Sequence, residues 1–165
     1  AEARSRANPP AIEYRRAAME ELDFPAGSFD LVFSSLAFHY VRDFAPLAVN
    51  IARWLKRGGA LVCSMEHPVF TSSGPQDWDY APDGTIRHFP VDRYFEEGER
   101  EAIFLGECVI KYHRTLTTIV GALFASGMRL TGLVEPQPPE DMLDLPGMRD
   151  EMRRPMMLLL SAKKA

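Results

Sequence analysis

Histidines are the side chains of this sequence best suited to acid–base chemistry near neutral pH. His39 comes five residues after the apolar run at 29–34, where a bound molecule could reach it. Because the pKa of an imidazole lies near 7, His39 could accept a proton from a hydroxyl group. A histidine that caps or packs locally is an equally good interpretation. His113, between Tyr112 and Arg114, leaves the same choice between contacting a bound molecule and anchoring the following helix.

A long segment from His67 to about residue 101 is rich in aromatic residues and has no periodic apolar run. Loops of this length inside a compact domain are usually functional or disordered, and the aromatic content argues against disorder. Aromatic side chains often line small-ligand sites, so this segment could form a binding pocket. A small hydrophobic cluster beneath the loop is the alternative. The side chains concerned are His67, Phe70, Trp78, Tyr80 and Tyr94.

The other polar and sulfur-containing residues give weaker signals. Four glutamates, Glu96, Glu97, Glu99 and Glu101, are expected to form a solvated face. The histidines and the two cysteines show no metal-ligand spacing, so the sequence predicts no metal. Cys63 and Cys108 lie among apolar residues and outside any CxxC pair, which predicts two reduced, buried thiols in a cytoplasmic protein.

The composition fits a single domain. The chain has 165 residues, of which 46% are hydrophobic and 25% are charged, which suits one buried core. The net charge is −4 and no basic stripe is visible, which argues against a nucleic-acid partner. No apolar run approaches the roughly 18 residues that predict a membrane span, so no membrane association is expected.

Apolar periodicity predicts alternating strands and helices. Continuous apolar runs at 29–34 and 60–65 are typical of strands buried on both faces of a parallel sheet. Helical spacing marks residues 44–55 and 116–124. Asp43 is expected to cap the first helix, and Gly58-Gly59 to end it, with Lys56 and Arg57 at its negative end. Further strands are expected at 12–16, 107–113, 129–134 and 156–162. This order predicts an α/β fold with a doubly wound, mostly parallel sheet, in which the last strand could pair antiparallel at one edge.

Several short motifs, in this order, carry a family resemblance. The run SFDLV at 28–32, after Phe24-Pro25, resembles the LPF…SFDLV run of class I S-adenosylmethionine-dependent methyltransferases. The segment SSLAFHYV at 34–41 is similar to the one after their fourth strand, and LKRGG at 55–59 to their LKPGG turn before the fifth. YHRTL at 112–116 and EPQP at 135–138 are similar to pieces of small-molecule members. Each piece is common alone, and the resemblance rests on their order and spacing.

The resemblance implies a Rossmann-like sheet of strand order 3-2-1-4-5-7-6, with strand 7 antiparallel. Residues 12–16 and 29–34 would be strands 3 and 4, and residues 60–65, 129–134 and 156–162 would be strands 5, 6 and 7. Strands 1 and 2 are lacking, and with them the GxGxG turn and the acidic residue that binds the ribose hydroxyls. We therefore expect residues 1–165 to be a single, N-terminally truncated methyltransferase domain with a substrate-covering insertion at about 67–114. A relocated strand 3, or another chain filling the gap, are the alternatives.

The resemblance also implies S-adenosylmethionine as the cofactor. Ala18, Met19 and Glu20 follow strand 3 and would face the adenine. The family often has an acidic residue at the position of Ala18, so adenine recognition here would rest on backbone groups around Met19. An ordinary loop is the alternative interpretation.

A second set of cofactor contacts is implied at the end of a central strand. Ser34, Ser35 and Leu36 lie at the carboxyl edge of the predicted sheet, where ligands of open α/β sheets bind. By resemblance they would contact the methionine moiety and the reactive methyl group. Simple termination of the strand is the alternative.

The expected function is transfer of a methyl group from S-adenosylmethionine to an O, N or C atom of a small molecule. Methyl transfer mainly requires alignment and exclusion of water, so a sparse catalytic constellation suffices. His39 would be the catalytic base, and His39, His67, Trp78, Tyr112 and His113 would bind the acceptor. A homodimer is left open. The alternatives are a non-catalytic module acting in protein interaction and, at lower rank, a nicotinamide-dependent reductase.

Overall fold

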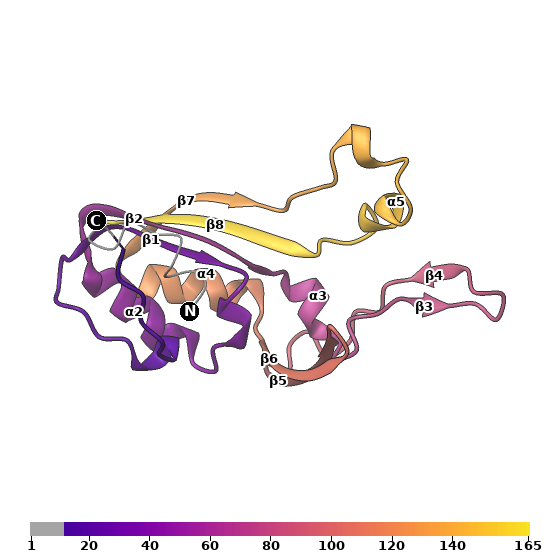
Figure 1. Ribbon diagram of the computed structural model, residues 1–165, viewed down its shortest axis with the longest axis horizontal. Helices are drawn as coiled ribbons and strands as arrows, with labels where there is room; N and C mark the ends of the chain where they lie inside the picture. The colour runs from indigo at the N-terminus through magenta and orange to yellow at the C-terminus, as the bar shows by residue number, and fades with distance from the viewer. Residues whose placement is uncertain (1–11) are drawn as a thin grey trace.

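Four strands form the main sheet of the protein, which the computed structural model describes over residues 12–165 (Figure 1). They are β1 (Phe29–Ser35), β2 (Leu55–Glu66), β7 (Met128–Val134) and β8 (Met157–Lys164), in the spatial order β1-β2-β8-β7. β1 and β2 run parallel, and β8 runs antiparallel to both β2 and β7. This order is the 4-5-7-6 part of the expected sheet, and the prediction of a Rossmann-like α/β fold with an antiparallel last strand is confirmed.

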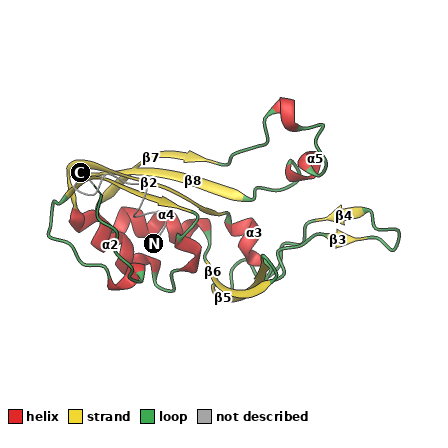
Figure 2. Cartoon of the chain, viewed as in Figure 1, coloured by secondary structure: helices red, strands yellow, loops and turns green. Residues whose placement is uncertain are grey.

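Two helices, α2 (Phe44–Trp54) and α4 (Leu116–Ala125), cover one face of this sheet (Figure 2). Phe44 and Ile51 of α2 are buried in one core cluster with Leu61 of β2 and Leu160 of β8. This apolar stripe at helical spacing fixes which side of α2 meets the sheet. Among residues 12–165, none of the helices has the length and apolarity that a bilayer crossing needs.

The opposite face of the sheet is apolar and exposed. Leu31 and Phe33 of β1 are 55% and 68% exposed, and Leu159 of β8 is 39% exposed. Their neighbours along each strand point the other way, toward α2 and α4, because successive side chains of a strand alternate between faces. The described part of the chain therefore covers only one face of this sheet with α2 and α4.

Two hairpins and several short helices lie beyond the carboxyl ends of β1 and β2. The hairpins pair β3 (Asp79–Tyr80) with β4 (Ile86–His88), and β5 (Gly98–Phe104) with β6 (Glu107–His113). Figure 1 shows the β3–β4 hairpin extending away from the sheet. The short helices there are η2 (Phe38–Tyr40), α3 (Pro68–Ser72), η3 (Glu140–Met142) and α5 (Met148–Glu151), whereas η1 (Met19–Glu21) precedes β1 in the chain.

One predicted strand is not formed. Residues 12–18 are irregular backbone and not the strand expected at 12–16. β1 is the edge strand of the sheet in the described residues, so this segment has no neighbouring strand with which to form a ladder. A β-type sequence becomes a strand only where such a partner exists, because the ladder satisfies its backbone groups.

The end of α2 also differs from the prediction. The helix ends at Trp54, and Leu55 already pairs with Phe29 as the first residue of β2. The next pair is Leu31 with Ala60, so residues 56–59 bulge out of the ladder. Lys56 Nζ lies 2.8 Å from Asp30 Oδ2 and does not serve as a charge at the helix end. The two glycines thus shape a bulge in a strand, and they do not cap the helix.

Candidate active site

A cavity of about 430 Å³ lies at the carboxyl ends of β1 and β2. Leu36, the residue after β1, and Glu66, the last residue of β2, both contribute to its wall. Ligands of open α/β sheets bind at this edge, so the cavity is the candidate active site. Most of the wall is apolar, formed by Leu36, Phe70, Pro75, Ile103, Phe104, Met156 and Met157.

Three polar side chains form a closed network on the cavity wall. Lys111 Nζ lies 2.6 Å from Glu66 Oε1 and donates a hydrogen bond to Gln76 Oε1 at 2.7 Å. Gln76 Nε2 in turn donates to Glu66 Oε2 at 2.8 Å. Glu66 and Lys111 are both buried. Each charge therefore has an opposite charge and an amide as partners, as a buried ion pair requires.

His39 lies beside this network, on η2. Its Nδ1 accepts a hydrogen bond from the backbone N–H of Glu66 at 3.2 Å, and its Nε2 lies 3.9 Å from Glu66 Oε1. Burial lowers the pKa of His39 to about 4, against an opposing attraction from Glu66. At neutral pH the ring is therefore uncharged. Because Nδ1 acts as the acceptor, the proton is on Nε2, and His39 presents an N–H donor.

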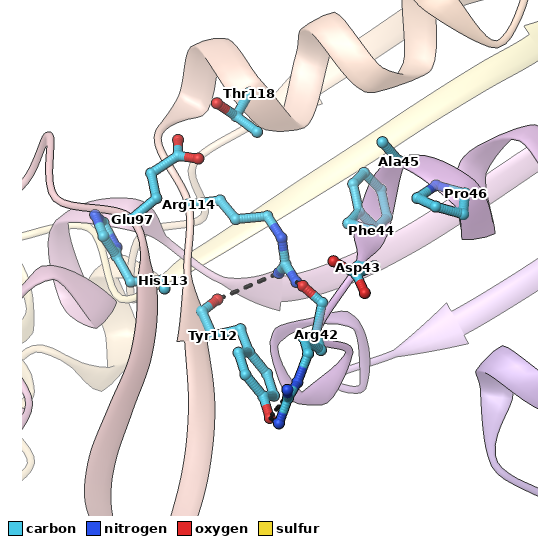
Figure 3. Close-up of a pocket in the computed structure, with 11 residues that line it drawn as sticks. Arg42, Asp43, Phe44, Ala45, Pro46, Glu97, Tyr112, His113, Arg114 and Thr118 are labelled. Atoms are coloured by element: carbon cyan, nitrogen blue, oxygen red, sulfur yellow. Dashed lines mark hydrogen bonds between the residues drawn. The ribbon is translucent and has the colours of Figure 1, made fainter.

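Tyr112 and His113 line a different cavity, of about 320 Å³, next to the start of α2 (Figure 3). Arg42 donates to Tyr112 Oη at 3.3 Å. His113 is fully buried, with Nδ1 2.8 Å from Thr71 Oγ1 and Nε2 2.8 Å from the carbonyl oxygen of Tyr94. Both ring nitrogens of His113 are thus engaged inside the protein. This geometry is that of a structural anchor.

Arg114 and Glu97, also at this second cavity, hold backbone segments in place. The half-buried Arg114, directly after β6, donates to the carbonyl oxygens of Val41 and of Arg42, the latter at 2.8 Å, and so ties the end of β6 to the loop before α2 (Figure 3). Glu97 Oε1 accepts from the N–H of Thr115 at 2.8 Å and from its hydroxyl at 2.7 Å. Glu97 therefore supports the start of α4 and is not only part of a solvated face.

His67 and Trp78 line neither of these two cavities. His67 Nδ1 accepts from the N–H of Val69 and caps α3, while Nε2 lies 2.9 Å from Glu135 Oε1. Trp78 packs edge-on against Phe89 and lies 4.8 Å from the Arg154 guanidinium. Of the five residues predicted to bind the acceptor, only His39 lies on the wall of the 430 Å³ cavity.

Comparison with known proteins places this fold in a family. Residues 1–63 match the methyltransferase domain family. A Listeria monocytogenes protein assigned to the S-adenosylmethionine-dependent methyltransferases is 43% identical, with a TM-score of 0.94 over 99% of this chain and 74% of that one. A Mesorhizobium loti S-adenosylmethionine-dependent methyltransferase is 38% identical, with a TM-score of 0.88 over 98% of this chain and 74% of that one.

The chain belongs to the class I S-adenosylmethionine-dependent methyltransferases. A Haemophilus influenzae protein is 29% identical over 147 residues, which are 86% of this chain and 56% of that protein. The chain thus spans a little over half the length of this relative. The family consists of enzymes whose methyl donor is S-adenosylmethionine.

Ser34, Ser35 and Leu36, which are expected at the donor, lie at the end of β1 in this methyltransferase chain, and their contact with the donor remains a prediction. Ser34 Oγ is buried and has no hydrogen-bond partner among the described residues, which suits a strand end that meets a polar ligand. Leu36 has a φ of 49°, and its N–H donates to the carbonyl oxygen of Ser64 at 2.9 Å. This turn ends the strand beside the cavity. Ser35 pairs with Ser64 in the ladder next to it.

The residues expected at the adenine of the methyltransferase cofactor lie in and before η1. Ala18 precedes η1 in an extended conformation, and its carbonyl oxygen accepts from the N–H of Glu21 at 3.1 Å. Met19 packs against the core and Glu20 is exposed. None of Ala18, Met19 and Glu20 lines the 430 Å³ cavity, so their contact with adenine remains a prediction.

Sequence reasoning missed Glu66, Gln76 and Lys111 in this methyltransferase chain. Glu66 had a usable signal, because it is an acidic residue directly after an apolar strand, at the edge where ligands bind. Lys111 lies in a predicted strand, and nothing local marks it as buried. Its partners are 35 and 45 residues away, so only the fold brings the three together.

Proposed function

We propose that the intact protein transfers a methyl group from S-adenosylmethionine to an O, N or C atom of a small molecule bound in the 430 Å³ cavity. The observation that carries this proposal is that Leu36 directly follows β1 and lines the cavity. The family resemblance implies that Leu36 contacts the donor, so the donor side and the acceptor side of the site would meet at this residue. A mostly apolar wall with a few converging polar groups is typical of small-molecule sites.

The residues of this chain would contribute binding, orientation and exclusion of water. When bound, S-adenosylmethionine supplies a methyl group that is already activated by a sulfonium. Ser34, Ser35 and Leu36 would hold the donor at the strand end. The apolar wall around Phe70 and Phe104 would keep water from the acceptor, and alignment of the two reactants is the main catalytic requirement.

His39 takes a different role in this proposal from the one expected of it. A base needs a ring nitrogen that can accept a proton, and Nδ1 of His39 already accepts the Glu66 N–H. We therefore assign His39 the role of an Nε2–H donor that orients the acceptor.

Calorimetry with S-adenosylhomocysteine tests the donor half of this proposal. The intact protein should bind S-adenosylhomocysteine with one site per chain, and absence of binding would remove the proposal. The acceptor half is tested with Ile103→Trp, which places a large ring at the cavity mouth. This variant should still bind S-adenosylhomocysteine but lose transfer of labelled methyl groups to a small-molecule extract. Undiminished transfer would show that the acceptor binds elsewhere.

A further inference from the structure

The charges that face the 430 Å³ cavity cancel. Glu66 and Lys111 are the charged side chains on its wall among the described residues, and they lie 2.6 Å apart. Gln76 bonds to both of them and closes the network. A ligand with its own charge would have to compete with this pair or remain uncompensated in an apolar cavity. Both alternatives are costly.

A further cation that packs against the cavity wall is also balanced. The guanidinium of Arg154 lies 4.8 Å from the Phe70 ring, behind the cavity wall, and pairs with both carboxylate oxygens of Glu151 at 2.7 and 3.1 Å. It therefore offers no net charge to a ligand. The ring of His39 is uncharged at neutral pH because burial lowers its pKa to about 4.

Two polar atoms on the wall are spaced for one hydroxyl group. His39 Nε2 and Glu66 Oε1 lie 3.9 Å apart, which is longer than a direct hydrogen bond. The first is an N–H donor and the second is a carboxylate acceptor. One hydroxyl oxygen within about 2.8 Å of both atoms could accept from His39 and donate to Glu66. An ether or a ketone can only accept, and an ammonium group can only donate.

We infer that this cavity binds an uncharged, largely apolar small molecule through a hydroxyl group that bridges His39 Nε2 and Glu66 Oε1. As the identity of a methyl acceptor, this inference rests on the proposed function. As a statement about binding, it can be tested without any transfer of a methyl group. Alcohols and phenols are the chemical classes that fit it.

Four phenyl compounds of closely similar size test the inference by calorimetry on the intact protein saturated with S-adenosylhomocysteine. 4-Ethylphenol is uncharged and has the hydroxyl, tyramine adds an ammonium, 4-hydroxyphenylacetate adds a carboxylate, and ethylbenzene lacks the hydroxyl. We expect 4-ethylphenol to bind at least about tenfold more tightly than each of the others, which corresponds to one good interaction. Equal or tighter binding of any of the other three, or no binding of 4-ethylphenol, overturns the inference.

Variants of the network make the test specific. Lys111→Met leaves Glu66 as a single anion and should move the preference to tyramine, whereas Glu66→Gln should move it to 4-hydroxyphenylacetate. Because either variant can fail to fold, the double variant Glu66→Gln/Lys111→Met is the safer arm, and it should still prefer 4-ethylphenol to both charged compounds.

His39→Phe should reduce binding of 4-ethylphenol to the level of ethylbenzene and leave ethylbenzene unchanged. A double variant that prefers a charged compound, or an unchanged 4-ethylphenol affinity in His39→Phe, contradicts the inference.

The two proposals fail in different ways. If S-adenosylhomocysteine does not bind but 4-ethylphenol binds with the expected preference, the proposed function is lost and the hydroxyl site stands. If S-adenosylhomocysteine binds and none of the four compounds does, the hydroxyl site is lost and the donor half of the proposed function stands.

Discussion

The ammonium group of Lys111 lies 2.6 Å from Glu66 Oε1, and the two side chains are only 3% and 9% exposed. Lys111 is in the middle of β6 and Glu66 ends β2, 45 residues earlier in the chain. The pair therefore connects the β5–β6 hairpin to the main sheet at the candidate active site. Removing one partner of such a buried pair leaves the other charge without compensation, which is far more costly than losing both.

Lys111→Met should lower the free energy of unfolding by about 3–5 kcal/mol, measured by urea denaturation of the intact protein. Glu66→Gln/Lys111→Met should recover most of this loss, because no single charge remains buried. Lys56→Met is the matched control: Lys56 pairs with Asp30 at 2.8 Å, but the two side chains are 50% and 82% exposed. Its loss should be at most about 1 kcal/mol. Equal losses of unfolding free energy in Lys111→Met and Lys56→Met would contradict the burial of the Glu66–Lys111 pair.

The stability of the protein should fall as the pH is lowered from 7 to 5, in part through His39. The pKa of His39 is about 4 in the folded protein, against about 6.5 when unfolded, so the unfolded state binds protons first. The contribution of His39 to the free energy of unfolding is complete above about pH 6.5 and is lost as the pH falls toward 4. At pH 5 the loss from this residue is about 2 kcal/mol. Urea denaturation at several pH values in this range should show that the free energy of unfolding depends less steeply on pH in His39→Phe than in the wild type.

His88→Gln provides the control for the pH experiment. His88 ends β4 on the projecting hairpin, and its side chain is 64% exposed. In His88→Gln, the free energy of unfolding should depend on pH as steeply as in the wild-type protein. The burial of His67 and of His113 lowers their pKa values as well, so some slope should persist in His39→Phe. If His39→Phe leaves the pH dependence of the free energy of unfolding unchanged, the lowered pKa does not belong to His39.

The sequence predicted most of the sheet, because its strands are continuous apolar runs and the order of the motifs carried the resemblance. The errors came where pairing partners decide the structure. Residues 12–16 have β-type residues but no neighbouring strand among those described, and Lys56 bonds to Asp30 across a bulge that no local rule predicts. Helical periodicity located α2 correctly but could not show that β2 begins directly after Trp54.

The site was less predictable than the fold, for a physical reason. Local patterns mark His39, Tyr112 and His113 as chemically interesting, but the structure places only His39 on the cavity wall, whereas His113 is fully buried between Thr71 and Tyr94. The charge balance of the cavity depends on Lys111, which a strand pattern cannot distinguish from an exposed lysine. Such information exists only in long-range contacts.

Two glycines should respond oppositely to alanine. A Cβ on Gly59 would lie 2.9 Å from the carbonyl oxygen of Lys56 and 3.2 Å from that of Asp30, so the bulge backbone would have to move. Gly59→Ala should lower the free energy of unfolding by about 1–3 kcal/mol. Gly121 lies in α4 with nothing within 4 Å of such a Cβ, and Gly121→Ala should raise stability by up to about 1 kcal/mol. Thermal or urea denaturation of both variants measures these changes. If Gly59→Ala is stabilising, the bulge is not packed too tightly for a Cβ.

The two thiols should differ in reactivity by orders of magnitude. Cys63 is buried in β2, and burial raises its pKa to about 12, whereas Cys108 is exposed on β6, contrary to the prediction of two buried thiols. The thiolate is the reactive form, and at pH 8 a thiol of pKa 12 is ionised in only about one molecule in 10,000. A maleimide should therefore label Cys108 in the native protein and leave Cys63 unlabelled, as read by peptide mass mapping. In 6 M guanidinium chloride, the control condition, both should react, and comparable native labelling of Cys63 would show that the core around β2 opens readily.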